Sequence, residues 1–133
     1  MIKKIIIFIA LIQSALMAEF KEVSVSELEG MMKQNVQIID IRTPGEWKET
    51  GVIKGSHKIM FFDDRGKYDI DKWMAEFNKH VKDTNQPFVL VCRTASRTKM
   101  VGKFLDGQMG YKHVNDLKGG IMKWMRSDKE VVK

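Results

Sequence analysis

The residue with the clearest chemical potential is Cys92, the only cysteine in the chain. It follows the apolar run Val89-Leu90-Val91 and precedes a short polar segment that leads into a helical pattern from about Thr98. This order predicts a strand, a tight loop and a helix. Such a geometry surrounds a thiol with loop N–H groups and a helix N-terminus, and both favour an anion. The thiolate is the reactive form of cysteine, so the stretch is typical of a nucleophilic site.

The loop itself, Arg93-Thr94-Ala95-Ser96-Arg97-Thr98, combines positive charge with small and hydroxyl side chains. Its two arginines favour an anionic reactant, and the hydroxyl groups of Thr94 and Ser96 add donors. The alternative is an inert core residue, because free cysteine is among the most buried residue types. The position of Cys92 at the end of a strand, directly before a cationic loop, favours a reactive thiol.

Length and composition limit the classes of protein to which the chain can belong. Its 133 residues suit one domain, and 44% hydrophobic and 30% charged residues are typical of a globular protein with a core. One cysteine excludes an intramolecular disulfide, a Cys-rich zinc site and a C-x-x-C redox pair. The histidines His57, His80 and His113 lack metal-ligand spacing, so we expect no metal site. The net charge is +6, but the basic residues form no Lys/Arg-rich block in the sequence, so we do not expect nucleic-acid binding.

The N-terminus has the layout of a secretory signal peptide. A short basic start, Lys3-Lys4, precedes the apolar run Ile5–Leu11, and the sequence then thins into small and polar residues up to Ala18. We therefore expect residues 1–18 to be cleaved off and residues 19–133 to form one domain in the periplasm. The apolar run is shorter than the ~20 residues that a membrane span requires, so an uncleaved anchor is the minor alternative. A free thiol in an exported chain is itself a sign of reactivity.

Hydrophobic periodicity predicts several helices. Ser24 and Glu27 form a capping-box pattern ahead of a helix that ends near Gln34-Asn35. Asp69 or Asp71 precedes a second helix whose apolar residues recur at helical spacing. Two more helices are expected over residues 98–109 and after the pair Gly119-Gly120.

Short strands are expected between these helices, over residues 36–41, 56–60, 88–91 and 113–117. The alternation indicates βαβ units, and therefore an α/β fold with a central, mostly parallel sheet and helices on both faces. The segment 46–55 is predicted to be a loop with at most one turn of helix. The charged tail 127–133 is expected to fray.

In a parallel α/β sheet, the site lies outside the carboxyl ends of the strands. The Cys92 loop lies there by construction. The corner Asp40–Arg42 and the turn Lys118-Gly119-Gly120 also follow strands and are expected at the same edge. The sequence therefore predicts one site, built from three separate segments.

Three blocks of the sequence stand out together, over about residues 20–126. They are Ile38-Ile39-Asp40-Ile41-Arg42-Thr43-Pro44-Gly45-Glu46-Trp47 with Gly51-Val52-Ile53-Lys54-Gly55-Ser56-His57-Lys58-Ile59 after it, Val89-Leu90-Val91-Cys92-Arg93-Thr94-Ala95-Ser96-Arg97-Thr98, and Leu117-Lys118-Gly119-Gly120-Ile121-Met122-Lys123-Trp124. Together these blocks resemble the single-domain rhodaneses of the exported bacterial type. Any one block alone is weak, but all three in order at this spacing are specific. The family commonly has histidine at the position of Val52, where we expect a structural role.

The resemblance implies the three-layer rhodanese fold and a sulfurtransferase reaction that needs no cofactor. Cys92 would attack the outer sulfur of thiosulfate, polysulfide or a similar donor, become a persulfide, and pass the sulfur to a thiol or cyanide-like acceptor or a protein partner. The N–H groups of residues 93–98 would hold the outer sulfur. Asp40 and Arg42 would brace the neighbouring corner, with Glu46 as ion-pair partner, and all three are expected to give structural support.

Alternative functions share parts of this pattern. Phosphatases and arsenate reductases of this fold use a loop one residue longer, whereas four residues separate Cys92 from Arg97 and position 98 is threonine. We therefore expect neither activity. A sulfane-sulfur carrier with little turnover has the same sequence features and is the main alternative. A non-catalytic scaffold is the third, and the presence of Cys92 argues against it.

Overall fold

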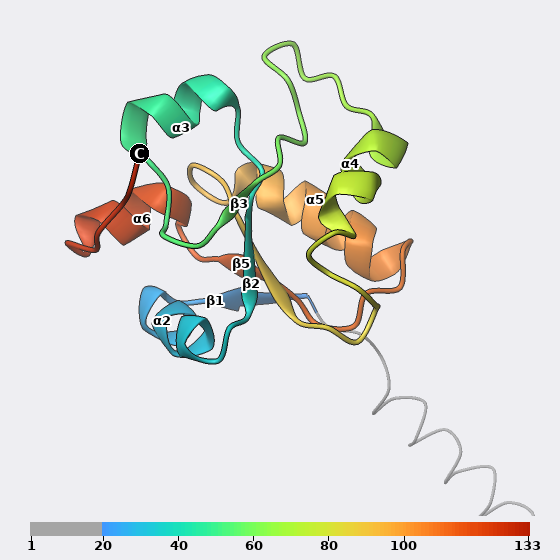
Figure 1. The fold of residues 1–133 in the computed structure, drawn as a ribbon, viewed down its shortest axis with the longest axis horizontal. Coiled ribbons are helices and arrows are strands. Elements are labelled where there is room, and N and C mark those ends of the chain that lie inside the picture. Colours follow the sequence, from blue (N-terminus) through green and yellow to red (C-terminus); the bar gives the residue numbers. More distant parts are fainter. Residues whose placement is uncertain (1–19) are drawn as a thin grey trace, which may run out of the picture.

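A sheet of five parallel strands forms the centre of residues 20–133, the part of the chain that the computed structural model describes (Figure 1). The predicted signal peptide over residues 1–18 lies outside that part. The sheet order is β1 (Lys21–Val23), β5 (Val114–Leu117), β4 (Phe88–Val91), β2 (Gln37–Asp40) and β3 (His57–Lys58). Every neighbouring pair is parallel, so the predicted parallel α/β sheet is confirmed.

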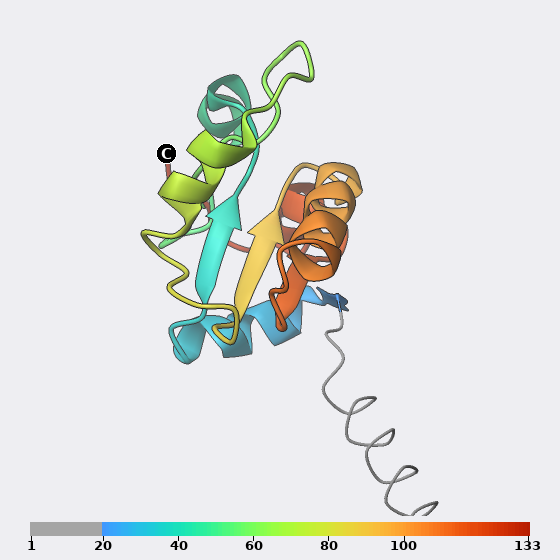
Figure 2. The ribbon, with the colours of Figure 1, turned by 90° about the vertical axis from the view of Figure 1, so that its right-hand side faces the viewer.

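The central strand β4 is buried on both of its faces. Phe88 and Leu90 belong to one hydrophobic cluster and Val89 and Val91 to another, as the two-residue period of a strand requires. Because helices cover both faces of a parallel sheet, its strands need not alternate apolar with polar residues. Figure 2 shows β2 and β4 running the same way, toward the end of the molecule where α3 lies. That end carries the loop after Cys92.

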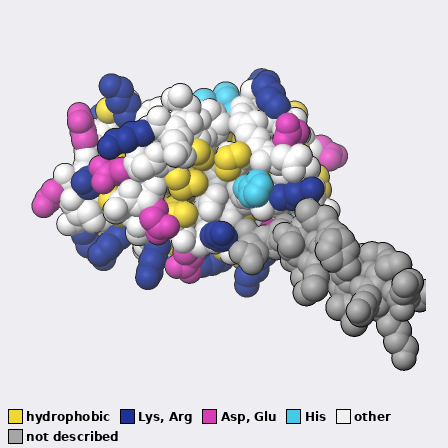
Figure 3. Space-filling model, turned by 90° about the horizontal axis from the view of Figure 1, so that it is seen from below, with side chains coloured by type: hydrophobic (Ala, Val, Ile, Leu, Met, Phe, Trp, Pro, Cys, Tyr) yellow, Lys and Arg dark blue, Asp and Glu magenta, His cyan; other side chains and the backbone are white. Residues whose placement is uncertain are grey.

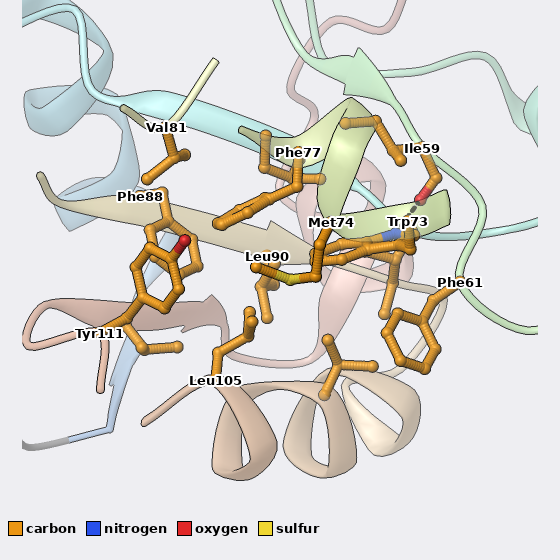
Figure 4. Close-up of a cluster of buried hydrophobic side chains, with 14 of the residues drawn as sticks. Ile59, Phe61, Trp73, Met74, Phe77, Val81, Phe88, Leu90, Leu105 and Tyr111 are labelled. Atoms are coloured by element: carbon orange, nitrogen blue, oxygen red, sulfur yellow. Dashed lines mark hydrogen bonds between the residues drawn. The ribbon is translucent and has the colours of Figure 1, made fainter. Parts of the chain in front are cut away.

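Helices α4 (Ile70–Phe77) and α5 (Ser96–Gly107) cover one face of the sheet. Figure 4 shows the aromatic and aliphatic side chains that fill the space between α4, β4 and α5. Trp73 combines packing with a hydrogen bond, since its Nε1 donates to the carbonyl of Ile59 at 3.0 Å. Its stacking on Phe77, with ring centroids 4.8 Å apart, continues the aromatic layer.

Helices α2 (Val25–Lys33) and α6 (Gly120–Arg126) cover the other face. The capping box predicted for α2 is confirmed, because Ser24 Oγ accepts from the N–H of Glu27 at 3.1 Å and the Glu27 carboxylate accepts from the N–H of Ser24 at 3.0 Å. Leu28, Ile121 and Trp124 bury their side chains against the sheet. The prediction of helices on both faces is therefore confirmed.

Two segments differ from the sequence predictions. The supposed loop 46–55 overlaps helix α3 (Pro44–Thr50), which Thr43 caps, with Glu46 completing a second capping box. The tail 127–133 does not fray, because Val132 exchanges backbone hydrogen bonds of 2.7 and 2.8 Å with Val52. Strand β1 was not predicted, since three residues with two exposed side chains give no readable pattern.

The surface carries charges of both signs. On the face shown in Figure 3, Lys and Arg side chains are spread among Asp and Glu, with a small group of hydrophobic side chains between them. Within residues 20–133, no helix is long and apolar enough to cross a bilayer.

Candidate active site

Cys92 lies directly after β4, at the carboxyl end of the strand, and belongs to the cluster between the sheet, α4 and α5. Only 1% of the residue is exposed. Its Sγ lies 3.6 Å from Oγ1 of Thr98, which is in the first turn of α5. An inert core cysteine would show the same burial, so the surroundings decide what this thiol can do.

The loop after Cys92 leaves its backbone donors free. Within the described part of the chain, the N–H groups of residues 93–98 donate to no backbone or side-chain acceptor. Ala95 adopts the left-handed conformation with φ of +81°, and α5 begins at Ser96, two residues earlier than predicted. A run of unpaired N–H groups at a helix N-terminus favours a bound anion.

The first turn of α6 supports this loop through backbone hydrogen bonds. The N–H groups of Ile121 and Met122 donate to the carbonyls of Cys92 and Arg93, at 2.9 and 3.2 Å. Gly120 has φ of +63°, and a Cβ on it would lie 2.3 Å from the carbonyl oxygen of Arg93. Only glycine allows this close approach of two backbones. The third sequence block therefore acts as a support for the second.

Arg97 is fully engaged by a carboxylate. Its Nη1 and Nη2 donate to Oε1 and Oε2 of Glu46, each at 2.7 Å. These hydrogen bonds lower the pKa of Glu46 to about 2, and they raise the pKa of Arg97. The expectation that Glu46 pairs at the Asp40–Arg42 corner is wrong, because the capped first turn of α3 places its carboxylate against α5 instead.

The other polar residues of the loop lie at its rim. The side chain of Arg93 is 45% exposed and lies 3.8 Å from that of Glu49. Thr94 and Ser96 are exposed, and within residues 20–133 their hydroxyl groups bond to no other protein group. These three side chains are therefore free to meet a reactant that approaches the loop, whereas Arg97 is held in place.

Asp40 and Arg42 form a buried ion pair beside the loop. Nε of Arg42 lies 3.0 Å from Oδ1 of Asp40 and its Nη2 lies 2.8 Å from Oδ2, with both residues at most 1% exposed. The guanidinium also donates to Thr50 Oγ1 and to the carbonyl of Gly51, and Trp47 Nε1 donates to Asp40. The contacts with Trp47, Thr50 and Gly51 hold the middle and the C-terminal end of α3, the helix that carries Glu46, against the end of β2.

A second buried carboxylate, Asp116 at the carboxyl end of β5, was not predicted from the sequence. Its Oδ2 accepts from Thr98 Oγ1 at 2.8 Å and from Lys99 Nζ at 2.6 Å, and the side chain is wholly buried. A carboxylate inside a short, otherwise buried strand was the signal that could have found it. Lys99 also pairs with Glu22 on β1 at 3.1 Å.

Other features of the structure lie apart from this loop. A cavity of about 510 Å³ opens between β3 and α4, lined among others by Lys58, Tyr68 and Trp73, and it contains none of the predicted site residues. In residues 20–133, no group of three or more His, Cys, Asp or Glu side chains is placed to hold a metal ion.

Comparisons with known proteins agree on one family. The family model of the rhodanese-like domain matches residues 24–127. A protein of Bacillus subtilis (strain 168), named "Putative sulfurtransferase YtwF", is 31% identical over 108 residues, which cover 80% of this chain and 91% of that protein.

Solved structures show the same fold. A rhodanese-related protein from Thermoplasma volcanium has a TM-score of 0.63 at 21% identity, covering 84% of this chain and 97% of that one. The polysulfide-sulfur transferase homodimer from Wolinella succinogenes has a TM-score of 0.64 at 24% identity, covering 94% of this chain and 86% of that one. At these identities, the likeness concerns the fold alone.

Proposed function

Because the chain belongs to the rhodanese-like domain family, as its three sequence blocks predicted, we propose that it is a sulfurtransferase whose nucleophile is Cys92. The observation that carries the proposal is the run of unpaired N–H groups over residues 93–98, directly beside the thiol. An inert core cysteine needs no such donors. A sulfur that carries negative charge does, because buried charge must be hydrogen-bonded.

The proposed reaction has two displacement steps. The Cys92 thiolate attacks the outer sulfur of thiosulfate, the Sγ–S bond forms, and the donor's S–S bond breaks with its electron pair leaving on sulfite. The persulfide carries its charge on the outer sulfur, which the loop N–H groups stabilise. A nucleophilic acceptor, such as a thiolate or cyanide, then takes the outer sulfur and returns Cys92 to the thiolate. Polysulfide enters the same scheme, with a shorter polysulfide as leaving group.

The two arginines of the loop have different roles, because only one of them is held by an ion pair at close distance. Arg97 is held by Glu46 and fixes the start of α5, so its role is to position the loop. Arg93 is exposed, and its 3.8 Å pair with Glu49 is weak in water, so it is available to an anionic donor. Binding of the donor therefore rests on backbone N–H groups and on Arg93.

Intact-mass spectrometry tests the proposal. We expect the wild-type protein to gain one sulfur atom after incubation with thiosulfate, and to lose it on addition of cyanide with release of thiocyanate. Cys92→Ser is the matched control, because serine has nearly the same shape as cysteine and lacks the nucleophilic sulfur. The absence of an adduct from thiosulfate, polysulfide and persulfide donors would contradict the proposal.

The burial of Cys92 favours a second candidate, a sulfane-sulfur carrier with little turnover of its own. With 1% of the residue exposed, a bound sulfur is shielded from small acceptors and available to a partner that opens or fits the loop. The same experiment separates the two functions. A sulfur adduct that cyanide and small thiols do not remove indicates the carrier.

We also propose that the protein acts in the periplasm after removal of residues 1–18. The support is the basic start, apolar run and small residues of the N-terminus, together with the single cysteine. N-terminal sequencing of the protein recovered from a periplasmic fraction should begin at Glu19. Recovery of the full-length chain in the membrane fraction would instead identify an uncleaved anchor.

A further inference from the structure

Asp116 is a buried carboxylate that the sulfur-transfer steps do not use. Its side chain has no exposed surface, and its Oδ2 is shared by the hydroxyl of Thr98 and the ammonium of Lys99. The second oxygen, Oδ1, is buried and meets no hydrogen-bond donor within residues 20–133. A buried carboxylate with a purely structural role is expected to accept hydrogen bonds on both oxygens. The unpaired Oδ1 of Asp116 therefore indicates a further role.

The contacts of Thr98 connect this carboxylate to the nucleophile. Oγ1 of Thr98 lies 2.8 Å from Oδ2 of Asp116, 3.1 Å from the carbonyl of Ala95 and 3.6 Å from Sγ of Cys92. A hydroxyl group has one proton to donate. Both oxygen neighbours are acceptors, and the charged one is closer, so the proton is directed to Asp116. The hydroxyl then offers only lone pairs to Cys92, and these accept a hydrogen bond from the thiol but not from the thiolate.

We propose that Asp116 is a positioning residue that restrains the ionisation of Cys92 through the hydroxyl of Thr98. While Asp116 is charged, the Thr98 proton is withheld from the sulfur, and the resting thiol is favoured over the thiolate. Lys99 opposes this restraint, because its ammonium neutralises part of the charge on Asp116. In the persulfide, the charge moves to the outer sulfur, one bond away from Sγ. The restraint therefore acts on the free cysteine more than on the sulfur-loaded one.

Other charges near the thiol come from several elements. Arg97 on α5 and Asp40 on β2 interact electrostatically, and Arg97 also interacts with Cys92. Glu46 on α3 neutralises Arg97, and Glu22 on β1 reaches the site through Lys99. The side chains of α4 that enter the cluster with Cys92 are apolar. Arg97, Asp40 and Glu46 remain in place in the variants below, so their charges affect all midpoints alike, and only Lys99→Gln also removes the partner of Glu22.

Titration of the thiolate by its ultraviolet absorbance tests the proposal. Cys92 is the only cysteine, so subtracting the same titration of a Cys92→Ser counterpart isolates its signal. We expect Asp116→Asn to shift the midpoint by about one to two units toward lower pH, because the Thr98 hydroxyl is then free to donate a hydrogen bond to the thiolate. Lys99→Gln should shift the midpoint in the opposite direction.

A third variant tests whether the effect passes through Thr98. In the Thr98→Val background, Asp116→Asn should shift the midpoint by less than half as much as in the wild type. An equal shift in both backgrounds, or an unchanged or raised midpoint in Asp116→Asn, would overturn the proposal. If Asp116→Asn does not fold, the Lys99→Gln variant tests the proposal instead, because the Lys99 side chain is 33% exposed and glutamine keeps most of its aliphatic stem and a hydrogen-bond donor. A midpoint of Lys99→Gln that is unchanged or lowered would overturn it equally.

The inference rests on the proposed role of Cys92 as nucleophile, but its test uses no sulfur donor. Midpoints that shift as expected in a protein that forms no sulfur adduct would refute the proposed function and leave the link between Asp116 and Cys92 standing. A sulfur adduct in a protein whose midpoints do not shift would support the proposed function and refute the link between Asp116 and Cys92.

Discussion

Arg97 and Glu46 are 51 positions apart in the sequence and form a two-point ion pair, with both nitrogen–oxygen distances at 2.7 Å. The pair joins the first turn of α5, which follows the Cys92 loop, to the first turn of α3. The buried pair of Asp40 and Arg42 fixes the other end of α3 to the end of β2, because the Arg42 guanidinium also donates to Thr50 Oγ1 and to the carbonyl of Gly51. The position of the loop thus depends on a helix that the sequence did not predict.

The ion pair of Glu46 and Arg97 should make the free energy of unfolding depend on pH in the acidic range. The pKa of Glu46 falls from its ordinary value of 4.5 to about 2 in the folded protein, so its ion pair stabilises the fold fully above pH 4.5. That contribution should be lost as the pH falls from 4.5 toward 2. Urea unfolding across this range should show wild type and Glu46→Gln converging in free energy of unfolding as the pH falls.

Glu76→Gln serves as the control for this experiment. Glu76 pairs with Lys79 on the surface, where half or more of each side chain is exposed, so its loss should change the free energy of unfolding much less. If the difference between wild type and Glu46→Gln is the same at both ends of the range, the ion pair does not contribute as described.

Gly120→Ala should distort the Cys92 loop. The new Cβ would lie 2.3 Å from the carbonyl oxygen of Arg93, and φ of +63° is unfavourable for alanine. We expect a lower melting temperature and the loss of most sulfur loading by intact mass. Gly30→Ala, in a helix with no atom within 4 Å of the new Cβ, should instead stabilise the protein by about 0.5–1 kcal/mol. Normal loading by Gly120→Ala would show that the loop tolerates movement of its support.

Local patterns in the sequence were enough to predict much of the fold. The apolar run 88–91 matches β4 residue for residue, and the capping box of Ser24 and Glu27 marks the start of α2. Thr43-Pro44-Gly45-Glu46 carries the same box, yet the segment from Glu46 onward was predicted to be a loop. Proline at the first position of a helix is favourable, so the box was the better signal.

The contacts that were missed are those between distant segments. Nothing local tells that Glu46 faces Arg97, that Asp116 meets Thr98, or that Val132 pairs with Val52. Each depends on how helices and strand ends come together at one edge of the sheet. The sequence could place Cys92 at that edge, because strand and loop are local features, but it could not tell which loop cation would be neutralised.

Arg42→Ala should destabilise the protein strongly while leaving the chemistry of the folded fraction unchanged. It would leave the carboxylate of Asp40 buried without its cation, which costs about 3–5 kcal/mol. Urea unfolding should show this loss, whereas the exposed Arg65→Ala should change the free energy of unfolding by less than about 0.5 kcal/mol. Sulfur loading per folded molecule distinguishes a role of Arg42 in stability from a role in binding the sulfur donor. If Arg42→Ala stays stable but cannot be loaded, Arg42 acts on the donor instead of on the fold.

The burial of Cys92 predicts selectivity by the size of the reagent. Only 1% of the residue is exposed, so a bulky aromatic disulfide should reach Sγ only when the loop opens, whereas methyl methanethiolsulfonate should enter more readily. The ratio of the two modification rates in the folded protein should exceed the ratio in denaturant by on the order of tenfold or more. The denatured chain is the control, because it reports the intrinsic reactivities of both reagents toward the same thiol. Equal ratios in the two states would show that the loop is open in solution, and the carrier function would then lose the shielding on which it depends.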